Sequence, residues 1–420
     1  MFDAIAARGE AAAAVSDRGW LQAMLDAEAA LARALASAGV ISGEEAEAIA
    51  VACVAERFDA AEIAAAAAGA GNPVVPLKAA LAAAVEGPAA AQVHRGATSQ
   101  DILDTAAMLV AARALDPLLD DLLAARAAAA GLARDHRDTP LAGRTLLQQA
   151  VPVTFGLKAA GWMAGLEDAR RWVNELRVER LAAQLGGAAG TLASLGEAGP
   201  RVADAYAAAL GLPEPLLPWH TLRGRIGELA SALAVTSGAV AKIARDVVLL
   251  SQTEVAEVRE AKGGGSSAMP HKRNPVAAIC ALACAQQAPG LAATLLGAMA
   301  HEHERAAGSW HAEWRPLGEL LRSTGSAVAW LRESLEGLEV DPARMRANLD
   351  ATGGRMLAER VKDEAGEEAT ERALEAADFR AAVAELVGEE RADELLDPAG
   401  YLGSAGALVD RALDFYDREG

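Results

Sequence analysis

The stretch from 222 to 260 restricts the fold more than any other part of the chain. Alanine, glycine, serine and threonine fill much of its length, and a helix over it would be roughly 55 Å long at ~1.5 Å per residue. A helix that is small or apolar on several sides must be surrounded by other helices, so we predict an elongated helical bundle. The large apolar residues recur every three or four positions, as on one face of a helix: Ile226, Leu229, Leu233, Val240, Ile243, Val247 and Leu250.

Composition favours an all-α protein. Hydrophobic residues make up 52% of the chain but aromatic residues only 4%, and much of the apolar fraction is alanine, which favours helix and lets helices approach closely. No stretch has the pattern of a β-sheet. Five long helices are expected, at about 118–136, 152–185, 222–260, 276–307 and 314–336.

The 420 residues are too many for one small core, and changes in helix length indicate three domains. We predict short helices in an N-terminal domain over 1–112, the long-helix bundle over 113–344, and a small helical domain over 345–420. Further copies of the chain are the simplest way to cover the bundle.

The charge balance argues against broad surfaces for polyanions. Lys and Arg total 39 against 58 for Asp and Glu, a net charge of -19, which disfavours nucleic-acid and anionic-membrane partners. An anionic substrate therefore needs basic residues concentrated in one pocket. Cys53, Cys280 and Cys284 make no disulfide framework, and the N-terminus has no signal-like apolar run, so we predict a cytoplasmic protein.

The segment Gly263–Pro275 interrupts the helical pattern with the sequence Gly-Gly-Gly-Ser-Ser-Ala-Met-Pro-His-Lys-Arg-Asn-Pro. Three glycines reach conformations that other residues avoid, and two prolines fix φ and lack an amide donor, so a continuous helix is excluded. A plain linker would not gather two hydroxyls with His271, Lys272, Arg273 and Asn274. That density predicts a loop that binds an anion. The loop lacks the Gly-Lys-Ser/Thr ending of a nucleotide-binding P-loop.

Two further segments gather polar side chains beside predicted helices. The first, 93–105, carries His94, Thr98 and Ser99 before a helix whose free amides suit a carboxylate, although taken alone it favours simple capping. The second, 143–152, carries Arg144 and Gln148. The His-Glu-His-Glu run at 301–304 has its histidines on different helix faces, so no metal and no organic cofactor is implied.

In this order, the three segments resemble the signature regions of the fumarase/aspartase superfamily, which includes adenylosuccinate lyase. The resemblance implies three helical domains, a central five-helix bundle, and a homotetramer whose active sites are each built from three subunits. The chain is most similar to the bacterial 3-carboxy-cis,cis-muconate cycloisomerases within the superfamily. That similarity covers nearly the whole chain, including 71–77, 94–101, 218–221, 307–314 and 401–405.

Leu146 stands where adenylosuccinate lyases carry a histidine after the same Gly-Arg-Thr. An amine or hydroxide leaving group needs a general acid, whereas a carboxylate, with a pKa near ~4, leaves and attacks as the anion. The resemblance and Leu146 therefore favour lactonisation of a small-molecule tricarboxylate. The alternatives are an adenylosuccinate- or argininosuccinate-type lyase and, from another class, an inactive helical scaffold.

The resemblance also implies roles for individual residues. Ser266 transfers the carbon-bound proton, while Lys272 and Asn274 bind the carboxylate next to it and stabilise the enolate-like charge. For His94 a role in proton transfer and a structural role are equally favoured. For His220 a structural role is favoured. The catalytic candidates are Ser266, Lys272 and His94; the substrate-binding candidates are Thr98, Ser99, Arg144, Gln148, Asn274, Arg223 and His220.

Overall fold

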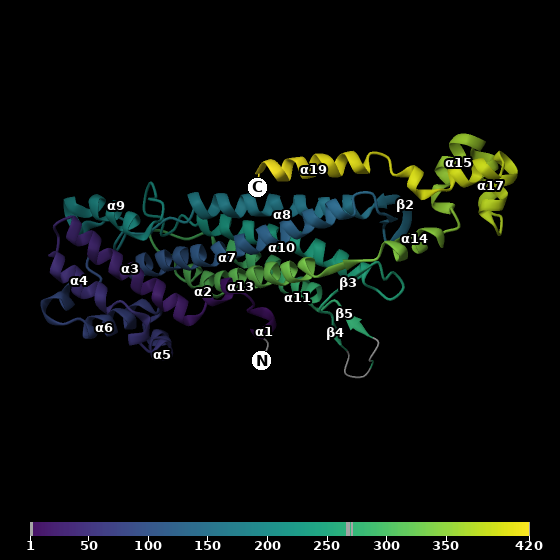
Figure 1. Ribbon diagram of the computed structural model, residues 1–420. Helices are drawn as coiled ribbons and strands as arrows, with labels where there is room; N and C mark the ends of the chain where they lie inside the picture. Colours follow the sequence, from purple (N-terminus) through teal and green to yellow (C-terminus); the bar gives the residue numbers. More distant parts are fainter. Residues whose placement is uncertain (1–2, 266–268, 270–271, 420) are drawn as a thin grey trace. The chain divides into compact units, whose positions relative to one another are not determined.

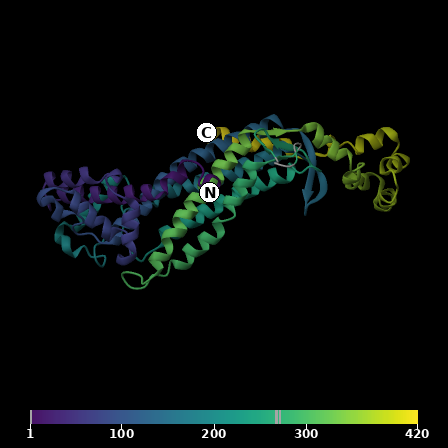
Figure 2. The same ribbon diagram turned by 90° about the horizontal axis from the view of Figure 1, so that it is seen from below.

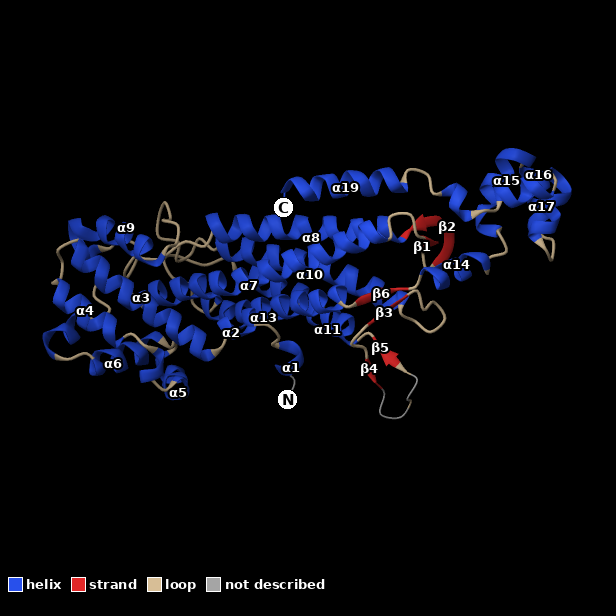
Figure 3. Cartoon of the chain, viewed as in Figure 1, coloured by secondary structure: helices blue, strands red, loops and turns tan. Residues whose placement is uncertain are grey.

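Helices make up most of the computed structural model, which describes residues 3–265, 269 and 272–419 (Figures 1 and 3). The strands among these residues are short and form three two-stranded antiparallel pairs. The all-α prediction is confirmed. The N-terminal helices and one later short helix are α1 (Asp3–Ala6), α2 (Glu10–Ala14), α3 (Asp17–Ser37), α4 (Gly43–Ala52), α5 (Ala60–Ala70), α6 (Val74–Ala84) and α9 (Gly199–Leu210).

Four long helices correspond to the predicted bundle helices. In α10 all seven apolar residues that set the spacing are buried, because this face packs against other helices. Helix α7 begins well before the predicted start at 118 and continues through Pro117, so the predicted domain boundary at 112–113 falls inside one continuous helix. The long helices are α7 (Ser99–Asp135), α8 (Phe155–Glu179), α10 (Gly224–Leu250) and α13 (Ser309–Glu336).

The fifth predicted helix, 276–307, is two helices. Helix α11 (Val276–Ala285) ends where Gln287 donates to the carbonyl of Cys284, and α12 (Ala288–Ala298) starts with Pro289 in its first turn. Proline fits the first turn of a helix because its missing N–H has no intrahelical partner there. The single long helix was therefore a wrong prediction.

The absence of sheet was also a wrong prediction for 140–154. Strands β1 (Pro140–Thr145) and β2 (Gln148–Thr154) form a hairpin with a two-residue turn, and α8 starts only at Phe155. The β-branched residues Val151, Val153 and Thr154 favour strand. Strand β1 pairs with Val153 and Thr154, and the register shifts between Ala142 and Arg144 because β2 has one extra residue there. Pro152 lies in a strand rather than at a helix start.

Helix α10 ends at Leu250, ten positions before the predicted end. The chain turns through 251–257 and enters β3 (Val258–Glu260), which pairs with β6 (Leu338–Val340). Strands β4 (Gly264–Gly265) and β5 (Arg273–Asn274) then pair on either side of the signature loop. A Cβ at position 264 would lie 2.4 Å from Val276 Cγ2, so this place in the pair requires glycine.

The chain divides into two compact units, each assembled from separated stretches. In the unit comprising 1–121, 169–238 and 283–329, α3 packs against α4 and α9 (Figures 1 and 2), and a buried bond between Ser237 and Thr324 joins α10 to α13. In the unit comprising 122–168, 239–282 and 330–420, Trp162 donates to Asp246 at 2.8 Å and joins α8 to α10. The long helices thus contribute to both units.

Short helices follow β6 and have a small core of their own. Val361, Ala373, Phe379, Val383 and Ala392 pack together there and are nearly inaccessible to solvent. A separate core is typical of a small domain, and the predicted domain boundary near 345 stays a prediction. The helices are α14 (Pro342–Asp350), α15 (Ala358–Ala365), α16 (Glu367–Leu374), α17 (Phe379–Val387), α18 (Glu389–Leu395) and α19 (Ala405–Glu419).

One described stretch, Val276–Ala298, is long and apolar enough to cross a membrane by length and composition. It comprises α11 and α12, and 44% of its most apolar window is buried inside the protein. Core helices of globular proteins have the same length and composition, and the break between α11 and α12 makes this stretch a poor spanning helix.

Candidate active site

Asp101 organises the start of α7. Its carboxylate accepts hydrogen bonds from the amides of Thr98, Gly186 and Gly187, each at 2.9 Å, and from His220 Nε2 at 2.7 Å. The bond to Thr98 is one half of a capping box, in which the side chain of the third helical residue binds the N-cap amide. One buried carboxylate therefore holds two distant segments against the helix start.

This arrangement leaves the hydroxyls of Thr98 and Ser99 without a partner among the described residues. Both residues are half-buried at the N-terminus of α7, where the free amides and helix dipole favour a negative charge. The simple capping expected from the sequence comes from the Asp101 side chain instead. The two predicted carboxylate-binding residues are thus available to a ligand.

His220 has a partner inside the protein. Its side chain is 4% exposed and is paired with Asp101, which is fully buried. Because a carboxylate only accepts, Nε2 carries the hydrogen of this bond. His220 is positioned to hold Asp101 and hence the start of α7.

Arg223 was predicted to contact the substrate, and the structure shows its side chain bound to acids of the chain. Its side chain is 1% exposed. The guanidinium donates two hydrogen bonds to Asp104 and two to Glu313, with N···O distances of 2.5 to 3.1 Å. Trp310 Nε1 also donates to Asp104, at 3.0 Å, and the ring of His301 lies 3.2 Å from Glu313. All of the fork of Arg223 is occupied by acids of the chain, so its contacts in this structure are structural, and the substrate-binding role stays a prediction.

His94 is held by a glutamate that no sequence motif indicated. Its Nδ1 lies 2.5 Å from Glu28 Oε1, and Glu28 is 1% exposed in the middle of α3. The one available signal was the position of Glu28 on the apolar face of that helix, three residues from both Leu25 and Leu31. An acid at such a position needs a buried partner.

Arg144 is anchored in the other compact unit. It donates from both terminal nitrogens to Glu257, at 2.8 and 2.9 Å, and Asn348 donates to the same carboxylate at 2.8 Å. Glu257 is fully buried, whereas the Arg144 side chain keeps 25% exposure. Arg144 therefore fixes the hairpin β1–β2 and still presents its remaining N–H groups to solvent.

The hairpin tip carries the unusual leucine. Leu146 and Leu147 form the two-residue turn, with φ of 53° and 65°, and their side chains are 96% and 76% exposed. Such turns normally use Asn-Gly, because both residues lie in the left-handed region. Gln148 follows directly and is also exposed.

Lys272 and Asn274 lie beside a large cavity in the same unit. Its volume is about 1010 Å³, and the turn after α10 lines it with Ser251, Gln252 and Thr253. Lys272 is exposed and Asn274 half-buried. Ser266 and His271 lie outside the described residues.

A buried acid anchors the chain that leaves the signature loop. Glu260 accepts from the amides of Ala277 and Ala278, at 3.0 and 2.8 Å, and from Ser334 Oγ at 2.7 Å. Its charge caps the free amides at the start of α11. Asn274 stands three residues before Ala277, so the anchored start of α11 fixes its position.

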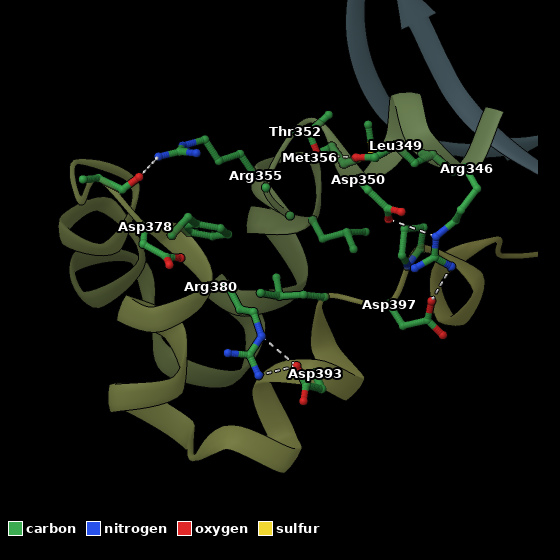
Figure 4. A pocket seen from close by; sticks show the side chains of 17 residues that line it. Arg346, Leu349, Asp350, Thr352, Arg355, Met356, Asp378, Arg380, Asp393 and Asp397 are labelled. Atoms are coloured by element: carbon green, nitrogen blue, oxygen red, sulfur yellow. Dashed lines mark hydrogen bonds and ion pairs between the residues drawn. The ribbon is translucent and has the colours of Figure 1, made fainter. Parts of the chain in front are cut away.

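A second cavity, of about 480 Å³, lies among the C-terminal helices (Figure 4). Three arginines and four aspartates line it, and Figure 4 shows that Arg346 and Arg380 face acids of the chain itself, whereas Arg355 donates to the carbonyl oxygens of Ala376 and Ala377. Arg346 binds Asp350 and Asp397, and Arg380 binds Asp393. Because two of the three arginines are paired with acids and aspartates outnumber arginines in the lining, the cavity lacks the concentrated positive charge that a trianion requires.

No cluster of three or more His, Cys, Asp or Glu side chains among the described residues is arranged to hold a metal ion. Thr98, Ser99 and His94 thus lie near the start of α7 in one unit. The other unit contains Arg144 on the hairpin β1–β2, and Lys272 and Asn274 beside the large cavity. Hydroxyls, amides and cations are the groups that bind carboxylates, so each of these places is suited to a carboxylate.

Comparison with known proteins agrees with this chemistry. Residues 6–290 match the family model described as Lyase. The chain is 48% identical to a 3-carboxy-cis,cis-muconate cycloisomerase of Bradyrhizobium diazoefficiens, over 97% of this chain and 96% of the relative, and equally 48% identical to a nitrosuccinate lyase of Streptomyces davaonensis, over 97% and 92%. It superimposes on the 3-carboxy-cis,cis-muconate lactonizing enzyme of Pseudomonas putida with a TM-score of 0.93 at 44% identity, covering 100% of this chain and 99% of that one.

Proposed function

Because the chain belongs to the lyase family, within the fumarase/aspartase superfamily, we propose that it is a cycloisomerase that lactonises 3-carboxy-cis,cis-muconate to a carboxymuconolactone. The enzyme then acts in the breakdown of protocatechuate. Leu146 is the observation that favours, within the family, a reaction whose attacking or leaving group is already a stable anion. It puts an alkyl group where a lyase of amines or hydroxide needs a proton donor.

The reaction rearranges the substrate without loss of atoms. A carboxylate oxygen of the substrate forms a bond to one carbon of a double bond, and the π electrons move to the neighbouring carbon, beside another carboxylate. That carbon then takes a proton. The attacking carboxylate is already an anion at neutral pH, so only the carbon requires an acid.

The described residues suggest a division of roles. Lys272 and Asn274 bind the carboxylate beside the carbon that accepts charge, where stabilisation is most effective. Thr98 and Ser99 bind a second carboxylate at the start of α7, and Arg144 and Gln148 contribute from the hairpin. The family resemblance makes Ser266 the donor of the proton to carbon.

The proposal includes a homotetramer with shared active sites, without a metal or organic cofactor. The exposed Leu146 and Leu147 support this, because two large apolar side chains at a hairpin tip gain by being covered by another copy. Nucleic acid and membrane are not among the proposed partners, and the proposed location is the cytoplasm.

A lyase acting on nitrosuccinate is the second candidate. The nitrosuccinate lyase is as similar in sequence as the cycloisomerase, and nitrite also departs as a stable anion. Leu146 is therefore compatible with both reactions. Neither an amine nor a hydroxide leaving group departs as a stable anion.

The test is to incubate the purified protein separately with 3-carboxy-cis,cis-muconate, nitrosuccinate and adenylosuccinate. Loss of the muconate absorbance, with the lactone identified by mass spectrometry, is the expected result. Nitrite release without muconate turnover would assign the second candidate. Cleavage of adenylosuccinate alone would refute the argument from Leu146.

A further inference from the structure

Glu28 and His94 form a buried pair for which the reaction described above has no use. The side chains are 1% and 8% exposed, and 2.5 Å separates Oε1 from Nδ1. Glu28 lies among apolar residues of α3, where a carboxylate is unfavourable unless it is hydrogen-bonded. Its other oxygen, Oε2, is buried and has no partner among the described residues. The pair is therefore maintained at a cost to the fold.

The backbone at His94 adds a second cost. Its φ is 65°, in the left-handed region, which the Cβ of an ordinary residue disfavours. Residues held in such conformations are concentrated at functional sites, where the surroundings impose them. A residue with only a packing role could be replaced by glycine here, since glycine adopts this conformation freely.

The geometry also fixes the tautomer of the ring. A carboxylate accepts hydrogen bonds and does not donate them, so Nδ1 carries the hydrogen and Nε2 is left over. No described residue hydrogen-bonds to Nε2. Four and five residues later come Thr98 and Ser99, whose hydroxyls have no partner among the described residues. His94 thus has one nitrogen committed to the protein and one open to a ligand.

We propose that Glu28 is a positioning residue that holds His94 in the Nδ1–H tautomer, with Nε2 directed to the start of α7. When the substrate carboxylate binds there, Nε2 takes a proton from solvent and donates a hydrogen bond to that carboxylate, while Nδ1–H stays bound to Glu28. This inference rests on the proposed function for the identity of the substrate. In this proposal Glu28 itself touches no substrate. Its effect is on the orientation of the imidazole, and misplacement of a contact by 1 Å costs about 100-fold in rate.

The first measurement needs no substrate. Histidine labelled with ¹⁵N reports the tautomer of each ring by NMR, and the His94 signal is the one missing from His94→Gly. We expect Nδ1–H in the wild-type protein and a mixture of tautomers in Glu28→Gln. An Nε2–H form in the wild type, or an unchanged spectrum in Glu28→Gln, overturns the proposal.

The second measurement is turnover of the muconate. Glu28→Gln should lower kcat/KM by about 100-fold. The double variant, Glu28→Gln with His94→Gly, should be no slower than His94→Gly alone, because both changes remove the same contact between His94 and the substrate. Added imidazole should restore part of the activity of His94→Gly but not of the double variant. Wild-type rates in Glu28→Gln overturn the proposal.

The matched control is Asp26→Asn, on the same helix. Asp26 pairs with Arg113 at the surface, so its loss should leave the rate unchanged. His94→Asn, which also tolerates a positive φ, replaces His94→Gly if that variant does not fold. A wild-type protein that shows the expected tautomer but no muconate turnover refutes the proposed function while the positioning role stands.

Discussion

The buried pair between Arg144 and Glu257 gives a prediction in which stability and activity separate. Glu257 is fully buried and accepts three hydrogen bonds, two from Arg144 and one from Asn348. Removing one member of a buried ion pair costs about 3–5 kcal/mol, because the other charge is left unpaired. Arg144 is 25% exposed, so water partly solvates it, and the low end, about 3 kcal/mol, applies to Glu257→Met.

The assay is amide hydrogen exchange along the ladder between β1 and β2, because local opening of the hairpin exposes these amides. A loss of about 3 kcal/mol corresponds to exchange roughly 100-fold faster, at 1.36 kcal/mol per factor of ten. Replacing both partners, Arg144→Met with Glu257→Met, should recover most of the protection, since a well-packed apolar pair replaces a buried ion pair at little cost.

Turnover behaves differently in the same variants. We expect Glu257→Met, Arg144→Met and the double variant all to lose most activity, because each removes the guanidinium or its fixed position. Hairpin exchange that stays at the wild-type rate in Glu257→Met refutes the reasoning about the anchor. An active double variant refutes the role of Arg144 at the site.

Three further predictions concern other parts of the chain. Burial raises the pKa of the Cys53 thiol to about 12, with the nearby charge of Glu28 adding to the effect, so iodoacetamide at pH 8 should modify Cys53 only after denaturation, as measured by mass spectrometry. Gly264→Ala should reduce turnover at least tenfold, because the new Cβ meets Val276 at 2.4 Å, and Val276→Ala should restore much of it in the double variant, as measured by kcat. Arg223→Met should lower the free energy of unfolding by about 3–5 kcal/mol in denaturant titrations, because it strands Asp104 in the core; a loss below ~1 kcal/mol contradicts the structural role.

The long helices were predictable because their signal is local. In α10 the three- and four-residue spacing of large apolar side chains predicts which face of the helix is buried, without knowledge of the helices that pack against it. All seven of these residues are buried. The hairpin at 140–154 has no such signal. Its first strand contains proline, glycine and arginine, and only pairing with residues such as Val153 and Thr154 of the second strand makes it a strand.

The site residues also divide into those that local sequence predicts and those that depend on distant partners. The signature loop and the start of α7 are recognisable because their polar residues are adjacent in sequence. The partners of Arg144 and Arg223 are not adjacent, since Glu257 and Glu313 lie 113 and 90 residues away. A basic residue that awaits a substrate and one that neutralises a buried acid have the same local sequence, which is why the buried partners of Arg223 could not be predicted.

The hairpin also bears on how such an enzyme changes its chemistry over evolution. The anchor at Arg144 holds the strands, whereas Leu146 and Leu147 are 96% and 76% exposed and contribute little to the packing of the chain itself. Substitutions at the two tip positions can therefore be sampled without unfolding the scaffold. A family that must accept different leaving groups has in this turn a place where a proton donor is gained or lost in one mutational step, and libraries randomised at 146 and 147 are the direct way to redirect the enzyme to a new substrate.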